Sequence, residues 1–285
     1  MGMENGEAGM AGLITFTSDF GTSEEWVGAV KGVILSVNPR AVIVDISHHI
    51  PPFDIGKGAF VLAAALPHMP RGVHLAVVDP GVGTRRLAVV LECARGDFLV
   101  GPDNGLLLPA AERLGGVSRA YFLENRDFFR HPVHPTFHAR DLFAPVAAHL
   151  SLGVDPSEMG MAMEVEDLVP APWGRAREGE GAVYASVIDV DRFGSLRLNA
   201  YPEQVERLGY QLGDRVMVGI GEGEMEVLLV STFGEVEAGT PLLFEDSSGV
   251  MALGINGGSL ASRTGSRPGD VVIIYGPADR GLAGG

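Results

Sequence analysis

The stretch VHLAVVDPGVGTRRLAVVLE, residues 73–92, holds two apolar runs on either side of a turn rich in glycine and charge. Residues 73–78 and 87–92 have the length and the β-branched content of buried strands. Asp79 directly follows the first run, and Arg85 and Arg86 close the turn. Strands that are apolar on both faces are typical of an α/β layer, in which helices cover the sheet. The stretch therefore predicts an α/β fold with a carboxylate at the end of a buried strand.

The same texture continues on both sides of this stretch and then changes. Further strand-like runs occupy residues 13–17, 41–46 and 98–101, and helical patterns occupy residues 24–38, 58–66, 104–114 and 141–152. This alternation predicts an α/β amino-terminal domain with a mainly parallel sheet over residues 12–155. Residues 156–180, rich in proline, glycine and charge, are expected to form a linker. Residues 181–285 contain short strand-like runs between glycine-bearing turns, which predict a smaller all-β domain, a barrel or a sandwich.

Composition narrows the classes of function. The chain has 285 residues, of which 46% are hydrophobic and 20% charged, as expected of a folded protein with a real core. Its net charge of −15 disfavours nucleic acid as a partner, since phosphate binding requires a basic surface. The sequence has neither a basic-then-apolar leader nor about 18 consecutive apolar residues, so we expect no membrane partner and a cytoplasmic location. The single cysteine, Cys93, lies in an apolar run and is expected to be buried.

Four aspartates lie in or directly after strand-like runs of the first half. They are Asp19, Asp45, Asp79 and Asp103. Ligands of open α/β sheets bind at the carboxyl ends of the strands, so these side chains are candidates for a site. An arginine close to Asp79 can orient its carboxylate through charge-assisted hydrogen bonds. A purely structural ion pair that fastens the turn is the alternative interpretation.

Three histidines, His131, His134 and His138, are spaced by three and four residues, which permits a metal hypothesis. Pro132 and Pro135 prevent the first two from forming a ligand pair on one helix. His138 precedes a predicted helix and can face a crevice from there.

Long motifs of the chain are similar to those of one known family. They are TSDFGTSEEWVGAVKGVI (17–34), VDISHHIPPFDI (44–55), AVVDPGVGTRR (76–86), GPDNGLL (101–107) and TFHARDLFAPVAA (136–148), with weaker matches at DVDRFGSL (189–196) and INGG (255–258). The chain thereby resembles the S-adenosylmethionine (SAM) hydrolases, also called SAM hydroxide adenosyltransferases, which are relatives of fluorinase and chlorinase. The resemblance implies an α/β domain followed by a smaller β domain. It also implies a homotrimer, with each site between the first domain of one subunit and the second domain of its neighbour.

The resemblance further implies an activity, in which water or hydroxide attacks the 5′ carbon of SAM and releases adenosine and L-methionine. SAM would be the small-molecule substrate, and neither a cofactor nor a metal would be required. The hydroxide-using members carry an Asp-Arg-His set that the halide-using members lack. Its positions here are Asp79, Arg86 and His138, so the chain resembles the hydroxide-using branch.

The family's binding residues also have counterparts in this sequence. Asp19 matches the aspartate that holds the ribose hydroxyls. The second domain would contribute Asp191, Phe193, Ser195, Ser247 and the backbone of Ile255. Two positions depart from the family pattern: Ser195 replaces the usual asparagine, and Ala252 stands where relatives often carry glutamate.

Two alternatives from other classes stay open on sequence grounds. The first is a metal-dependent hydrolase that uses Asp79, Asp103 and the histidine cluster. The second is a non-catalytic protein that binds nucleosides or SAM, for which Ser195 and Ala252 are the only indications.

Overall fold

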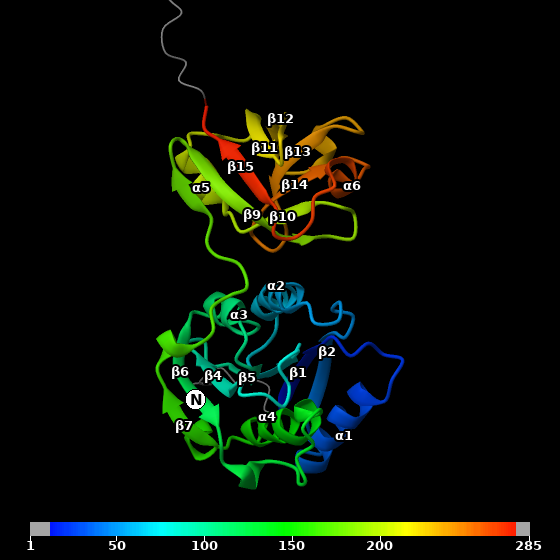
Figure 1. The fold of residues 1–285 in the computed structure, drawn as a ribbon, viewed down its shortest axis with the longest axis vertical. Coiled ribbons are helices and arrows are strands. Elements are labelled where there is room, and N and C mark those ends of the chain that lie inside the picture. Colours follow the sequence, from blue (N-terminus) through cyan, green and yellow to red (C-terminus); the bar gives the residue numbers. More distant parts are fainter. Residues whose placement is uncertain (1–11, 278–285) are drawn as a thin grey trace, which may run out of the picture. The chain divides into compact units, whose positions relative to one another are not determined.

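The computed structural model describes residues 12–277, which form two compact units that divide between Pro172 and Trp173 (Figure 1). Residues 278–285 of the expected second domain lie outside the described residues. Within the stretch 156–180, β7 (Gly160–Met163) pairs with a strand of the first unit, and β8 (Arg177–Gly179) pairs with a strand of the second. The α/β-then-β order expected from the sequence is confirmed.

The first unit is built on a seven-stranded sheet with the order β2-β1-β3-β5-β4-β6-β7. Its other strands are β1 (Leu13–Ser18), β2 (Val42–Ser47), β3 (Val73–Val77), β4 (Ala88–Cys93), β5 (Phe98–Pro102) and β6 (Val117–Leu123). The strands β2, β1, β3 and β5 run parallel, whereas β4, β6 and β7 pair antiparallel. The predicted α/β sheet is therefore mixed, with a parallel part from β2 to β5. Its antiparallel part begins at β4, because residues 94–97 between β4 and β5 are too few for a crossover and permit only a hairpin.

Two pairs of helices cover the sheet, with α1 (Trp26–Val37) against α4 (Ala144–Ser151), and α2 (Ile55–Ala65) against α3 (Leu108–Arg113). The two pairs lie on opposite sides of the sheet (Figure 1). Val27, Val30 and Ile34 form the buried stripe of α1, at the helical spacing expected from the sequence. This stripe packs with Phe16 and Phe143, both fully buried, in the core on that side of the sheet.

The second unit is a β-barrel, one of the two all-β folds expected from the sequence. It comprises β9 (Ala182–Val190), β10 (Leu196–Leu198), β11 (Arg215–Ile220), β12 (Gly223–Leu229), β13 (Pro241–Glu245), β14 (Met251–Ile255) and β15 (Val271–Tyr275), with short helices α5 (Pro202–Arg207) and α6 (Leu260–Thr264). The ladder β10-β14-β13-β12-β11-β15-β9 closes through the pairing of β9 with β10, and β8 adds outside the ring. Closure removes the exposed strand edges and encloses an apolar core.

The structure also shows the environment of Cys93 and the lengths of the helices. Cys93 is buried on β4, and burial raises the pKa of its thiol to about 12, as befits an inert core residue. Across residues 12–277, helices with the length and apolarity to cross a membrane do not occur.

Candidate active site

The turn from β3 to β4 brings Asp79 and Arg86 into a bidentate ion pair. Arg86 Nε donates to Asp79 Oδ1 over 3.1 Å, and Arg86 Nη2 donates to Oδ2 over 2.5 Å. The side chain of Arg86 is only 8% exposed and that of Asp79 only 5%. Thr84 tightens the turn, since its hydroxyl donates to the carbonyl of Gly81 and accepts from the amide of Arg86. The sequence-based expectation of an arginine that orients the strand-end carboxylate is thus met in the geometry.

His138 completes this group. Arg86 Nη2 lies 3.2 Å from His138 Nδ1. Because a guanidinium only donates, Nδ1 must accept, and the proton of the neutral ring then resides on Nε2. Burial and the nearby charge of Arg86 lower the pKa of His138. The imidazole is therefore neutral near pH 7, with its accepting nitrogen turned toward the Arg86–Asp79 pair.

A close backbone approach brings the segment that carries His138 to the Asp79 turn. Gly83 has a φ of +75°, and a β-carbon at this position would lie 2.5 Å from the carbonyl oxygen of Pro135. Only glycine fits such a contact without displacing the backbone. On the other side of the segment, the buried carboxylate of Asp141 accepts from the side chains of Arg130 and Arg140 and from the amide of His134. The segment is thus held at both ends.

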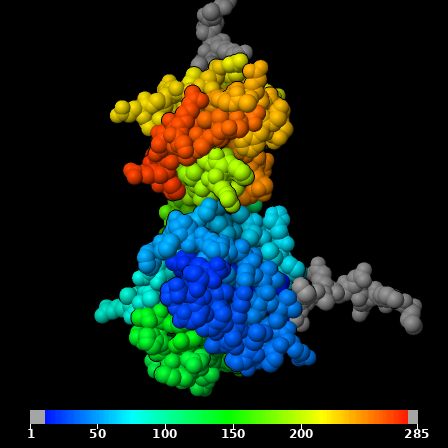
Figure 2. Space-filling view, turned by 90° about the vertical axis from the view of Figure 1, so that its right-hand side faces the viewer, coloured from blue at the N-terminus to red at the C-terminus, as the bar shows by residue number. Residues whose placement is uncertain are grey.

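Asp79 and His138 line a cavity of about 980 Å³ in the first unit, together with Asp19. Segments near residues 20 and 50 also line it, and they lie side by side on the surface of the unit (Figure 2). Asp19 follows β1, and its Oδ2 accepts from the amide of Phe53 over 2.9 Å. Phe53 has a left-handed φ of +68° and an exposed ring, which the sequence did not indicate. Such strain commonly marks functional sites.

Asp45 and Asp103, the other two strand-end candidates, do not line this cavity. Asp45 pairs with Lys31 at the surface. Asp103 Oδ1 accepts from the amide of Val169 over 2.9 Å, and burial raises the pKa of its carboxyl group. Asp103 is thus engaged in anchoring residues that follow the first sheet.

The histidines of the predicted cluster do not converge. His131 Nε2 lies 2.9 Å from the carbonyl oxygen of Arg126, and His134 Nδ1 lies 2.9 Å from the hydroxyl of Thr136. In the part of the chain that the structure describes, groups of three or more His, Cys, Asp or Glu side chains arranged to hold a metal ion are not found. The geometry therefore gives the metal hypothesis no support.

The five binding residues expected in the second half line a single cavity of about 840 Å³ on the barrel unit. They are Asp191, Phe193, Ser195, Ser247 and Ile255. Asp191 Oδ1 accepts from the amides of Phe193 and Ser195, at 2.9 and 2.8 Å, and so shapes its own turn. The ring of Phe193 is 79% exposed. One loop thus presents a carboxylate and an aromatic face at the cavity.

Sequence reasoning missed Arg197, which lines the same cavity. It bonds to Asp189 over 2.9 Å, eight residues away across the turn between β9 and β10, and to Asp246 over 2.6 Å, 49 residues away. Ala252, by contrast, is fully buried in an apolar cluster with Leu242 and Phe244. The departure at that position therefore lies in the barrel wall and not among the cavity-lining residues.

Family models described as the N-terminal and C-terminal domains of SAM hydroxide adenosyltransferase match residues 14–160 and 185–273. An (R)-S-adenosyl-L-methionine hydrolase of Salinispora tropica is 44% identical, over 90% of this chain and 95% of the relative. A fluorinase of an Actinoplanes species is 30% identical, over 87% of this chain and 92% of the fluorinase.

A solved structure has a similar fold. The crystal structure of an uncharacterized conserved protein from Thermotoga maritima superposes with a TM-score of 0.85 and 34% identity, over 92% of this chain and 99% of that one. Because the family models together span both units and the relatives cover nearly the whole chain, the protein belongs to the SAM hydroxide adenosyltransferase family.

Proposed function

We propose that this protein hydrolyses S-adenosyl-L-methionine to adenosine and L-methionine, by attack of water or hydroxide at the ribose 5′ carbon. Family membership and the hydrolase relative at 44% identity support this activity. The observation that carries the mechanism is the contact of Arg86 with both Asp79 and His138, two residues that line one cavity. The proposed reaction uses neither a cofactor nor a metal.

The reaction makes a specific demand on these residues. The leaving group is a neutral thioether, so it requires no general acid. The nucleophile is the difficulty, because bulk water has a pKa of about 15.7 and supplies little hydroxide. The site must therefore position one water, remove its proton and stabilise the charge that develops on its oxygen.

The geometry favours His138 as the group that takes this proton. Both oxygens of Asp79 already accept from Arg86, and an arginine keeps its charge near pH 7. Each Asp79 oxygen keeps a second lone pair that can orient a water, whereas His138 Nδ1 is an acceptor on a neutral ring that can take up a proton, 3.2 Å from Arg86. A water that replaces this contact would accept from Arg86 and donate to His138. In this proposal Asp79 orients the guanidinium and the water, and Arg86 stabilises the developing hydroxide.

Charge pairing along the reaction path also suits this cavity. An anionic nucleophile and a cationic sulfonium attract each other more strongly where water is excluded. Apolar side chains of Phe20, Trp26 and Ile50 line the same cavity as Asp79 and His138. Asp19 would hold the ribose hydroxyls and so keep the 5′ carbon in line with the water.

The remaining parts of the proposal concern binding and assembly. Asp191, Phe193, Ser195, Ser247 and Ile255 would bind the adenine and amino-acid ends of SAM. A homotrimer, with each site completed by a neighbouring subunit, and a cytoplasmic location also belong to the proposal. Native mass spectrometry of the protein with and without adenosine tests the trimer, since a monomer in both samples would contradict it.

The decisive experiment follows the oxygen atom. The protein is incubated with SAM in halide-free buffer that contains EDTA and oxygen-18 water. The proposal requires adenosine labelled at its 5′ oxygen and an equal amount of methionine. Turnover that appears only after metal is added would instead favour a metal-dependent hydrolase. SAM that is bound but unchanged under every condition would favour a binding protein.

Matched variants connect this activity to the site. Arg86→Ala should abolish turnover and leave adenosine binding largely intact. Arg85→Ala, a neighbouring and exposed arginine of the same turn, should retain wild-type turnover. Wild-type turnover in both variants would show that the Asp79–Arg86 pair serves only the fold.

A further inference from the structure

A second polar array lies next to Asp19, and the mechanism above does not use it. Ser18 Oγ lies 2.7 Å from His48 Nδ1, and His48 Nε2 lies 3.1 Å from Asp45 Oδ1. Lys31 Nζ donates to the other oxygen of Asp45 over 2.6 Å. Ser18 is fully buried and His48 is 4% exposed, although His48 also lines the cavity. Ser18 is buried and does not line the cavity, which indicates a role other than that of a nucleophile.

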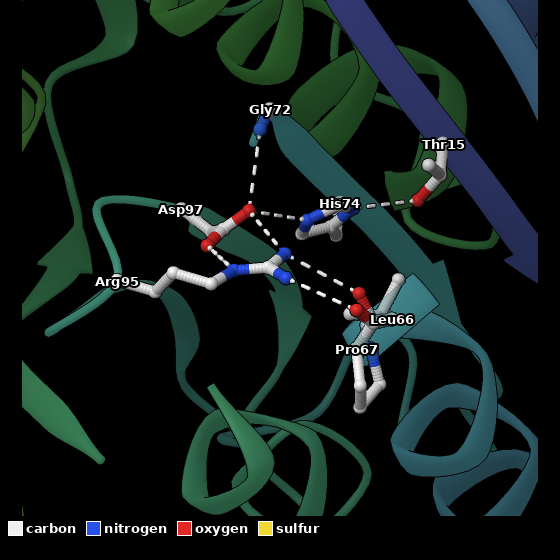
Figure 3. A network of polar contacts seen from close by, with 7 residues as sticks. All are labelled: Thr15, Leu66, Pro67, Gly72, His74, Arg95 and Asp97. Carbon is white, nitrogen blue, oxygen red and sulfur yellow. Dashed lines mark hydrogen bonds and ion pairs between the residues drawn. The ribbon is translucent and has the colours of Figure 1, made fainter. Parts of the chain in front are cut away.

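A similar series of hydroxyl, imidazole, carboxylate and cationic side chain occurs once more in this unit, away from the cavity. The hydroxyl of Thr15 lies 2.9 Å from His74 Nδ1, and His74 Nε2 lies 3.0 Å from Asp97 Oδ1 (Figure 3). Arg95 donates twice to Asp97 and reaches the carbonyl groups of Leu66 and Pro67 (Figure 3). None of the four side chains lines the cavity that contains Asp19. This array fastens strands together, and it provides an internal reference for the first.

The donors and acceptors of the Ser18 array have one consistent direction. Burial lowers the pKa of His48, which favours the neutral ring. A carboxylate only accepts, so the ring proton faces Asp45 from Nε2, although this contact falls short of a well-directed hydrogen bond. His48 Nδ1 then accepts from the hydroxyl of Ser18, which in turn accepts from the amide of Phe20 over 3.4 Å.

These bonds fix the turn that carries Asp19. Besides the Ser18 contact, the carbonyl group of His48 accepts from the amide of Gly21 over 2.7 Å. Asp19 therefore lies between two residues that are both bonded to His48. Its own carboxylate accepts from the amide of Phe53, in the loop that follows His48. The orientation of the Asp19 carboxylate thus depends on how the residue 18–21 turn is held against that loop.

We propose that Ser18 and His48 are positioning residues that orient Asp19 toward the 2′ and 3′ hydroxyls of the nucleoside. In this way they set the preference of the site for ribonucleosides over deoxyribonucleosides. The inference rests on the proposed function, in which Asp19 binds the ribose. It adds a role for two buried side chains that do not touch the reacting atoms.

The test compares the dissociation constants of adenosine and 2′,3′-dideoxyadenosine, measured by calorimetry. If Asp19 accepts from the ribose hydroxyls, the wild-type protein binds adenosine roughly 10- to 100-fold more tightly. Ser18→Ala should weaken adenosine binding about ten-fold and leave dideoxyadenosine binding unchanged, because a displaced carboxylate affects only the ligand with hydroxyls. Thr15→Val, the matched change in the reference array, should lower thermal stability but keep the wild-type ratio.

Two substitutions of His48 separate its two contacts and serve if Ser18→Ala does not fold. An asparagine oxygen can replace Nδ1 as the acceptor from Ser18, whereas a glutamine amide can replace Nε2 as the donor to Asp45. His48→Asn should therefore keep the preference for adenosine, and His48→Gln should lose it. The reverse order would overturn the proposal.

The outcomes also separate this inference from the one on which it rests. A Ser18→Ala protein with the wild-type ratio, or a Thr15→Val protein with an equal loss, would overturn the positioning role alone. A wild-type protein that binds both nucleosides equally would overturn the ribose-binding role of Asp19, and the positioning role with it.

Discussion

Gly83 offers a direct test of the contact between the Asp79 turn and the segment that carries His138. Replacement by alanine places a β-carbon 2.5 Å from the carbonyl oxygen of Pro135, whereas real β-carbons essentially never approach closer than 3.0 Å. The two backbones must therefore separate by at least about 0.5 Å, the difference between these distances. The left-handed φ of +75° adds about 1–2 kcal/mol of strain for a residue with a side chain.

The expected loss of activity follows from this displacement. Misplacement of a reacting group by about 1 Å can cost roughly 100-fold in rate, so a shift of about half that size should lower kcat at least ten-fold. The assay is the rate of adenosine formation from SAM, measured by liquid chromatography, together with the midpoint of thermal unfolding. The KM for SAM should change little, because Asp19 is not in the displaced segment.

Gly81→Ala is the matched control in the same turn. Its β-carbon would lie 3.5 Å from Thr84 Oγ1 and from the β-carbon of Arg86, which is ordinary contact, and its φ is not left-handed. This variant should keep wild-type kcat and change stability by less than about 1 kcal/mol. Wild-type kcat in Gly83→Ala, or equal losses in both variants, would refute the inference that this close approach holds His138 in place.

Three further predictions concern the charged groups. Arg86→Lys should lower kcat by about 100-fold while adenosine still binds. A lysine cannot donate two hydrogen bonds to the two oxygens of Asp79 and also reach His138. Unchanged kcat in a steady-state assay would contradict this prediction. The lowered pKa of His138 predicts a kcat that is level above about pH 6.5 and falls as acidification protonates the acceptor, so a pH profile that rises toward acid would be inconsistent. Asp97→Asn should lower the free energy of unfolding by about 3 kcal/mol at pH 7 in urea titrations. Burial alone would raise the pKa of Asp97, but its bonds to His74 and Arg95 outweigh burial and hold this pKa far below 3.8. The stabilisation is complete above about pH 4 and is lost progressively as the pH falls further, so the variant should approach the wild type in strong acid.

Strands β1, β3, β4 and β5 were predictable because burial on both faces gives each of them a continuous apolar run. The partly exposed strands β6 and β7 lack such a run and were not predicted. The mixed character of the sheet was also present in the sequence, since residues 93–97 between two such runs leave room only for a hairpin. The helix expected from residue 104 begins later, at Leu108. Asn104 instead uses its side chain to bond the carbonyl group of Val78 and the amide of Leu106, which holds the end of β3 in place.

The candidate site could be predicted from local pattern only where its residues are close in sequence. Asp79 and Arg86 are seven residues apart in one turn, and their pairing follows from that spacing. His138 is 52 residues from Arg86, and only the family resemblance grouped it with Asp79 and Arg86. Arg197 lies eight residues from Asp189, a spacing similar to that of Asp79 and Arg86, but its other partner, Asp246, is 49 residues away and gave no local signal.

The nature of the nucleophile explains why the three residues belong together. A halide ion carries no proton, so a site that uses halide needs only to strip water from the ion and place it in line with the 5′ carbon. Water must also lose a proton, and the product of that loss is a strong base that must be held until it reacts. Arg86 can supply the charge and Asp79 can fix its direction through both carboxylate oxygens, but a guanidinium offers no lone pair to take the proton. The neutral His138 would offer a proton acceptor at Nδ1, on the side of the ring that faces the guanidinium. Removal of His138 should therefore abolish reaction with water more completely than reaction with an added halide, because only the first reaction requires a proton acceptor.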